Sequence, residues 1–86
     1  MKSVAKTVTT TRSLVVAADN INRVVYIHVL GAGTVYLGGS DVTTTNGFLT
    51  EKNAIPQTIE LPAGEELWAV IGTGTDELRI LTPSVD

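Results

Sequence analysis

The chain is short, cysteine-free and mildly acidic, with 86 residues, one histidine and a formal net charge of −3. A domain of this length has a thin core, because it buries only roughly 60–65% of the surface that its unfolded chain exposes. The composition excludes disulfides, zinc–thiolate sites and multi-histidine metal sites. We therefore expect no cofactor, and we expect oligomerisation or docking on a larger body to supply further stability.

The N-terminal segment differs from the rest of the chain in charge. Lys2, Lys6 and Arg12 precede every acidic residue, and all nine acids follow them. Residues 1–11 are rich in threonine and show little apolar periodicity, which predicts an extended N-terminal arm on a single domain spanning residues 12–86. We expect the two cations of this arm, together with Arg12 directly after it, to bind an acidic protein surface, the alternative being a solvated tail. They are too few for a nucleic-acid interface on an acidic body.

The first predicted strands surround a glycine-rich loop. Residues 12–18 form a short apolar run that predicts a strand. β-Branched and aromatic residues then crowd residues 23–30 and 34–37, on either side of Gly31 and Gly33. This composition is typical of an antiparallel hairpin and unfavourable for a helix.

Further turn signals divide the rest of the chain into short strands. Asn46-Gly47 predicts the two-residue turn of a second hairpin, between residues 43–45 and 48–50. Pro56 is expected to open a strand at 57–61, and a type I turn at 61–64 follows it. The last predicted strands are 66–71 and 77–82.

Turn signals at this spacing predict an all-β fold, a small antiparallel β-sandwich or jelly-roll-like barrel. No apolar run approaches the ~20 residues of a membrane span, so we expect no membrane partner.

Alternate residues of a strand face opposite sides, so the predicted strands divide into a core set and an outward set. The core set is Val25, Ile27, Val29, Val35, Leu37, Ile59, Leu61, Leu67, Ala69, Ile71, Leu78 and Ile80. The outward set is too apolar for a solvated face, and we expect it to form an oligomer interface. Its members are Val24, Tyr26, His28, Tyr36, Trp68, Val70 and Leu81. A bulge that shifts the parity, or a second core layer, is the alternative.

No residue pattern predicts catalysis. His28 lacks a second histidine, a cysteine or a carboxylate in its own strand, so a structural role is favoured over metal binding. The paired glycines resemble phosphate-binding loops, but a strand rather than a helix follows each pair. Two acidic pairs, at residues 65–66 and 76–77, flank turns and are expected to meet at one rim. We expect no enzyme activity.

The order of these segments resembles small β-sandwich virion proteins of tailed bacteriophages. The resemblance runs from Asn22 to Leu81 and rests on Val35-Tyr-Leu-Gly-Gly-Ser-Asp-Val-Thr43, the Asn46-Gly47 pair and Glu66-Leu-Trp-Ala-Val70. It implies a capsid decoration (cement) protein on the virion surface. Its implied partners are the major capsid protein or another virion protein, and further copies of itself, with a trimer favoured.

Similar segments occur in tail and fibre proteins. The alternative function is therefore a carbohydrate- or receptor-binding module of a tail or fibre, in which Trp68 and the tyrosines stack on sugars.

Overall fold

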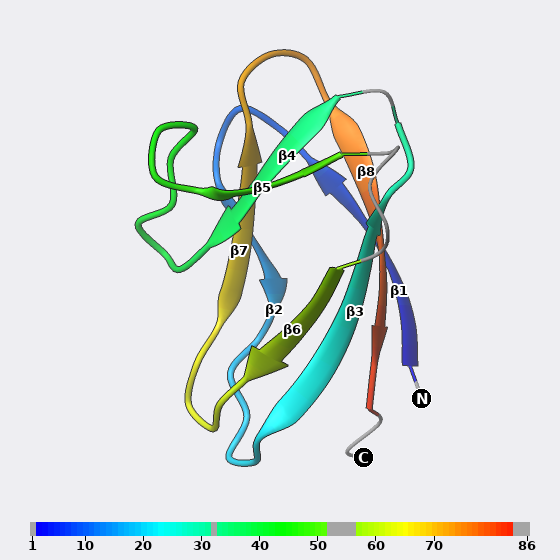
Figure 1. The fold of residues 1–86 in the computed structure, drawn as a ribbon, viewed down its shortest axis with the longest axis vertical. Helices are drawn as coiled ribbons and strands as arrows, with labels where there is room; N and C mark the ends of the chain where they lie inside the picture. The colour runs from blue at the N-terminus through cyan, green and yellow to red at the C-terminus, as the bar shows by residue number, and fades with distance from the viewer. Residues whose placement is uncertain (1, 32, 52–56, 84–86) are drawn as a thin grey trace.

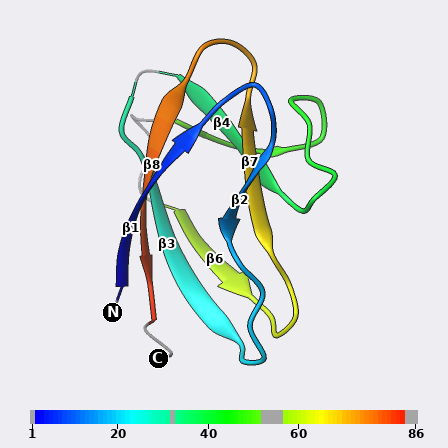
Figure 2. The ribbon, with the colours of Figure 1, turned by 180° about the vertical axis from the view of Figure 1, so that it is seen from behind.

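The computed structural model describes residues 2–31, 33–51 and 57–83, and these contain eight strands in two antiparallel sheets. Sheet A has the strand order β1-β8-β3-β6, and sheet B has the order β2-β7-β4-β5 (Figures 1 and 2). The strands are β1 (Lys2–Val8), β2 (Ser13–Val16), β3 (Arg23–Val29), β4 (Thr34–Gly38), β5 (Phe48–Glu51), β6 (Gln57–Leu61), β7 (Leu67–Ile71) and β8 (Asp76–Thr82). The predicted small antiparallel β-sandwich is confirmed. Pro56 lies outside the described residues.

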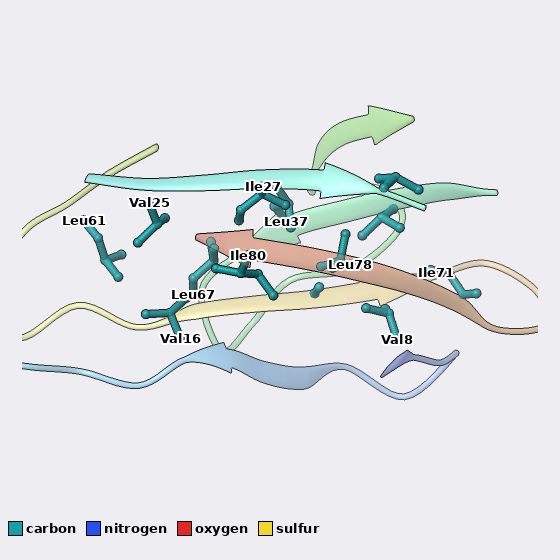
Figure 3. Packing of buried hydrophobic residues seen from close by; sticks show 13 residues of the cluster. Val8, Val16, Val25, Ile27, Leu37, Leu61, Leu67, Ile71, Leu78 and Ile80 are labelled. Carbon is teal, nitrogen blue, oxygen red and sulfur yellow. The ribbon is translucent and has the colours of Figure 1, made fainter. Parts of the chain in front are cut away.

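The core is the layer of apolar side chains between the two sheets (Figure 3). Every residue of the predicted core set is buried except Ile59, which is partly buried and packs against the others. The period of two in the sequence therefore assigned the inward face of each strand correctly. Val8 and Val16, which lie outside that set, complete the cluster. In β2 the register shifts between Leu14 and Val16, so this strand contains an irregularity.

The N-terminal segment belongs to the domain and is not a separate arm, which corrects the prediction for residues 1–11. Lys2–Val8 pairs antiparallel with β8 over its whole length, from Lys2 opposite Thr82 to Val8 opposite Asp76. Val8 is fully buried. The pairing explains the poor apolar periodicity, because β1 is an edge strand and contributes only part of its inward side to the core.

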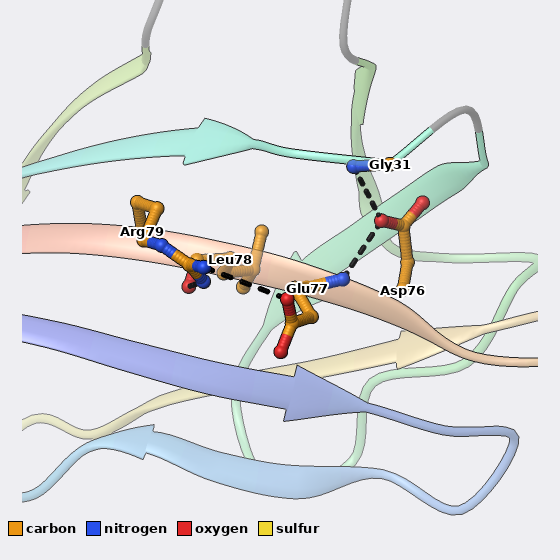
Figure 4. A network of polar contacts seen from close by, with 5 residues as sticks. All are labelled: Gly31, Asp76, Glu77, Leu78 and Arg79. Carbon is orange, nitrogen blue, oxygen red and sulfur yellow. Dashed lines mark hydrogen bonds and ion pairs between the residues drawn. The ribbon is translucent and has the colours of Figure 1, made fainter.

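The predicted hairpin between residues 23–30 and 34–37 is a corner between the two sheets. β3 lies in sheet A and β4 in sheet B. Asp76, at the start of β8, is buried, and its carboxylate accepts hydrogen bonds from the backbone N–H groups of Gly31 and Gly33, both at 2.8 Å. It also accepts one from its neighbour Glu77 at 2.7 Å (Figure 4). A Cβ on Gly31 would overlap this carboxylate, so the site requires glycine.

The two other turn predictions also need correction. Asn46-Gly47 is not a two-residue hairpin turn; it ends the longer 39–47 loop between β4 and β5, in which Gly47 N–H donates to Thr43 O at 2.9 Å. Residues 43–45 lie in this loop and form no strand. In the other turn, Glu65 N–H donates to Pro62 O at 3.1 Å, and Gly64 has a φ of +84°. This φ at the third position is typical of a type II turn, one residue later than the predicted type I turn.

We expect truncation of Val8 to destabilise the domain. Val8→Ala removes two methyl groups from a fully enclosed site and should lower the free energy of unfolding by about 2–3 kcal/mol. Val24→Ala, on the exposed side of the same sheet, is the control and should cost less than about 1 kcal/mol. Urea titration of both variants measures the difference. Equal losses would contradict the placement of β1 in the core.

We also expect the Asp76 carboxylate to be needed for the corner. Asp76→Asn keeps the shape of the side chain but replaces one acceptor oxygen by an NH2 group, so a buried N–H loses its partner at a cost of about 1–3 kcal/mol. Glu77→Gln, at the exposed neighbour, should cost less than about 1 kcal/mol. Thermal unfolding of the two variants tests this. A neutral Asp76→Asn would show that the corner holds without the carboxylate.

Candidate functional site

The three leading cations, Lys2, Lys6 and Arg12, do not form one patch. Lys2 and Lys6 stand opposite Thr82 and Leu78, two inward residues of β8, so both lysines occupy inward register positions of the edge strand. Arg12 lies in the connection to β2, where its guanidinium donates to the Val42 carbonyl at 3.1 Å. The structure therefore places two of these cations on an edge strand and the third against a loop carbonyl, and their docking on an acidic partner stays a prediction.

The seven residues of the predicted oligomer interface lie on two opposite faces of the sandwich. The pairing partners and parity of their strands place them. Those on the outer face of sheet A are Val24, Tyr26, His28 and Leu81. Those on the outer face of sheet B are Tyr36, Trp68 and Val70. A single flat interface cannot contain both groups, and this corrects the predicted site.

The outer face of sheet B is partly covered by the chain itself. Gly38 faces outward on β4, and a Cβ there would lie 2.9 Å from the Val42 side chain, so the 39–47 loop folds back over this face. Val42 is buried, although it is in a loop. Val70 borders the same hollow as Val42 and is only 6% exposed. Val70 therefore belongs to a small second core layer and is not available to a partner.

The two outward-facing aromatic residues of sheet B, Tyr36 and Trp68, are half-buried. Trp68 lies opposite Gly38 and Leu14, and its indole N–H donates to the Glu66 carboxylate at 3.1 Å. Tyr36 packs under the same loop, since a Cβ on Gly47 would overlap the Tyr36 side chain. Both residues are less exposed than Tyr26 on sheet A, which is 44% exposed.

The outer face of sheet A is open and carries a group of exposed apolar side chains, with Thr58 and Glu60 on the neighbouring strand β6 beside them. Tyr26 stands opposite Leu81 on the neighbouring strand, and Val24 lies two residues along from Tyr26. Their exposed fractions are 44%, 38% and 39%. The outward residues of β1 are Ser3, Ala5 and Thr7, and the small side chains of Ser3 and Ala5 line a shallow hollow of about 500 Å³ beside the larger side chains. This outer face of sheet A is the candidate functional site.

Polar groups border the same hollow. His28 stands opposite Arg79, and both line it. Arg79 in turn lies 3.5 Å from Glu77 in an exposed ion pair. Two neighbouring cationic or basic groups at the rim suit a carboxylate or hydroxyl partner more than another cation.

Two features of the surface were not predicted from the sequence. The first is the hollow, which is lined by the small side chains of Ser3 and Ala5. These residues alternate with Lys2, Val4 and Lys6, and this alternation could have predicted a strand whose outward side is small. Phe48 and Leu49 on β5 are the other omission, with 61% of Phe48 exposed. Phe48 occupies an inward register position opposite Leu37, but β5 is an edge strand and leaves the ring uncovered.

The acidic pairs do not meet at one rim. Glu65 and Glu66 precede β7, whereas Asp76 and Glu77 follow the turn after it, so the pairs lie at opposite ends of that strand. Within residues 2–31, 33–51 and 57–83, no three His, Cys, Asp or Glu side chains are grouped in a way that could hold a metal ion. In the same ranges, no helix is long and apolar enough to cross a membrane.

Comparisons with known proteins give no assignment. No family model, curated protein or solved structure matches the chain.

We expect that a larger residue at Gly47 cannot be accommodated where the 39–47 loop packs on sheet B. Gly47→Ala would force a Cβ into the Tyr36 side chain and should cost about 1–3 kcal/mol, with a change in Trp68 fluorescence as the loop shifts. Gly72→Ala is the matched control, because the nearest atom to its new Cβ would be 3.9 Å away. Urea titration followed by fluorescence compares the two. A destabilised Gly72→Ala with an unaffected Gly47→Ala would contradict the loop packing.

Proposed function

We propose that this chain is a non-enzymatic structural protein of a tailed-bacteriophage virion, a capsid decoration protein that associates through the outer face of sheet A. The observation that carries the proposal is the continuous apolar surface formed by Val24, Tyr26 and Leu81 on two adjacent strands. Tyrosine suits such a surface because it buries a large area with few rotatable bonds and keeps a polar end. The β-sandwich and the resemblance in segment order support the same class.

The size of this face favours attachment through many weak contacts. Three strands of seven residues and one of five, spaced about 4.8 Å apart, cover roughly 400 Å² in plan. A stable interface of standard size buries about 800 Å² on each partner, so one such face gives a weak contact. An oligomer that presents several copies of the face to a repeating lattice gains affinity through its effective concentration. Multivalent binding to a capsid is therefore the use that fits a face of this size.

A carbohydrate- or receptor-binding module of a tail or fibre is the second candidate. The observation in its favour is the hollow where Tyr26, His28 and Arg79 converge, because an exposed aromatic ring beside hydrogen-bonding groups is suited to a sugar. Trp68, which the sequence favoured for this role, is half-buried and hydrogen-bonded to Glu66. Tyr26 would have to take its place.

We expect Tyr26→Glu to disrupt association while the fold is kept. The side chain is nearly half exposed, so the charge is tolerated in the free chain, but it is costly to bury against a partner. Losing an anchor residue of about 2 kcal/mol weakens association roughly 30-fold. Sedimentation velocity at micromolar concentration, and co-sedimentation with capsids lacking the protein, measure the loss.

Leu49→Glu is the matched control for this experiment. Leu49 is exposed to a similar degree, but it lies on the outer face of sheet B, and its replacement should leave association unchanged. A wild-type chain that stays monomeric and binds no capsid contradicts the proposal. If that monomer instead shows saturable shifts of its tyrosine signals with oligosaccharides, the second candidate is favoured.

A further inference from the structure

Arg23, the first residue of β3, is a buried cation. It pairs with Leu61 on β6 and shares its inward parity with Val25 and Ile27, so its side chain enters the layer between the sheets. Only 8% of the residue is exposed. A charge in this position requires compensation, because transfer of an unpaired ion out of water is costly.

The described residues compensate this charge incompletely. One terminal nitrogen of the guanidinium donates to the Ala17 carbonyl at 3.0 Å. The Nε atom is enclosed, and no acceptor among the described residues lies within hydrogen-bonding reach of it. Across residues 2–31, 33–51 and 57–83, no carboxylate approaches Arg23 within 4.0 Å, whereas Arg79 does have such a partner. Most of the five donors of the guanidinium therefore have no acceptor within the part of the chain that the structure describes.

The guanidinium borders a small hollow between β1, β2 and the end of β8. This hollow has a volume of about 190 Å³, roughly six times the ~30 Å³ of a water molecule in the liquid. Its charged lining residues are Lys2, Asp19 and Arg23, which together carry one net positive charge. The Asp19 carboxylate accepts from Asn20 N–H at 2.6 Å, so part of its capacity is used locally. Apolar side chains form most of the remaining wall.

We propose that this hollow is a binding site for a small oxyanion, of the size of a carboxylate group or inorganic phosphate, held by Arg23 and Lys2. The planar guanidinium matches two oxygens of such a group, and the lysine adds a second positive charge. Because Nε is enclosed, the anion contacts the terminal nitrogens. One negative charge would neutralise the net charge of the lining. This site is separate from the outer face of sheet A and does not depend on the proposed function.

The oxyanion has two sources that share this chemistry. It is either a free anion or the acidic side chain of a macromolecular partner. The apolar residues around the cations can contact the aliphatic part of a glutamate side chain, so the hollow suits a glutamate as well as a free anion. The experiment therefore includes probes for both.

Nuclear magnetic resonance of the arginine side chains tests the site. The enclosed Nε–H of Arg23 exchanges slowly and gives an observable signal, and the signals of Arg12 and Arg79 serve as internal controls. Titration with acetate, with phosphate and with blocked glutamate at constant ionic strength should shift the Arg23 signal saturably. Chloride and blocked glutamine should not. A response to phosphate or acetate alone identifies a free anion, and a stronger response to blocked glutamate identifies an acidic side chain.

Two lysine variants sharpen the test. Lys2→Gln removes a cation at the rim and should weaken binding about two- to fivefold, as expected for a partly exposed charge pair. Lys6→Gln is the matched control, since it lies on the same strand, has the same charge and does not line the hollow. The site is refuted if no probe shifts the Arg23 signal saturably, if all three arginines shift together, or if the two lysine variants behave alike. Arg23 would then serve only to tie β3 to Ala17.

Discussion

The fold depends on one layer of apolar side chains, to which each sheet contributes an alternating row. In a chain of 86 residues without cysteine, this thin layer is the main contribution that opposes the loss of conformational entropy on folding. Each strand joins the layer through every second residue, so a shift of one residue would turn a whole row outward. β1 belongs to the domain for the same reason, because Val8 extends the layer at one end.

The period of two is local, and this is why the sequence predicted the inward residues and most strand positions. The pairing of strands is not local. Gly31 and Gly33 indicate a turn, but the residue that makes this turn a corner between sheets is Asp76, 45 and 43 positions further along the chain. Glycine composition alone cannot distinguish a hairpin from a corner. The corner forms because the N–H groups of both glycines have no partner on an adjacent strand and donate instead to a buried carboxylate from a distant part of the chain.

The same limit explains why the candidate site was only partly predicted. Parity correctly indicated that Tyr26 and Tyr36 point away from the core, but it cannot say that their strands belong to different sheets. The burial of Val70 beneath the 39–47 loop could not be predicted either, because Val42 lies in a loop, where the sequence has no periodic pattern. An apolar outward residue therefore has two physical explanations, a partner or a second layer of the same chain. On sheet B the apolar outward residue Val70 is covered by a loop of the same chain, whereas the outer face of sheet A is left uncovered by the described residues.

The free edge of β1 is less suited to association than the outer face of sheet A, and this supports the choice of the face in the proposed function. One edge of this strand is paired with β8, and the other has no strand neighbour among the described residues. Lys2 and Lys6 occupy inward positions along it, and inward lysines on an edge strand disfavour the addition of another strand, which would enclose their charges. The outward positions of the same strand carry Ser3 and Ala5, which leave the neighbouring apolar side chains accessible. Thus β1 protects its edge with one side and opens the outer face of sheet A with the other.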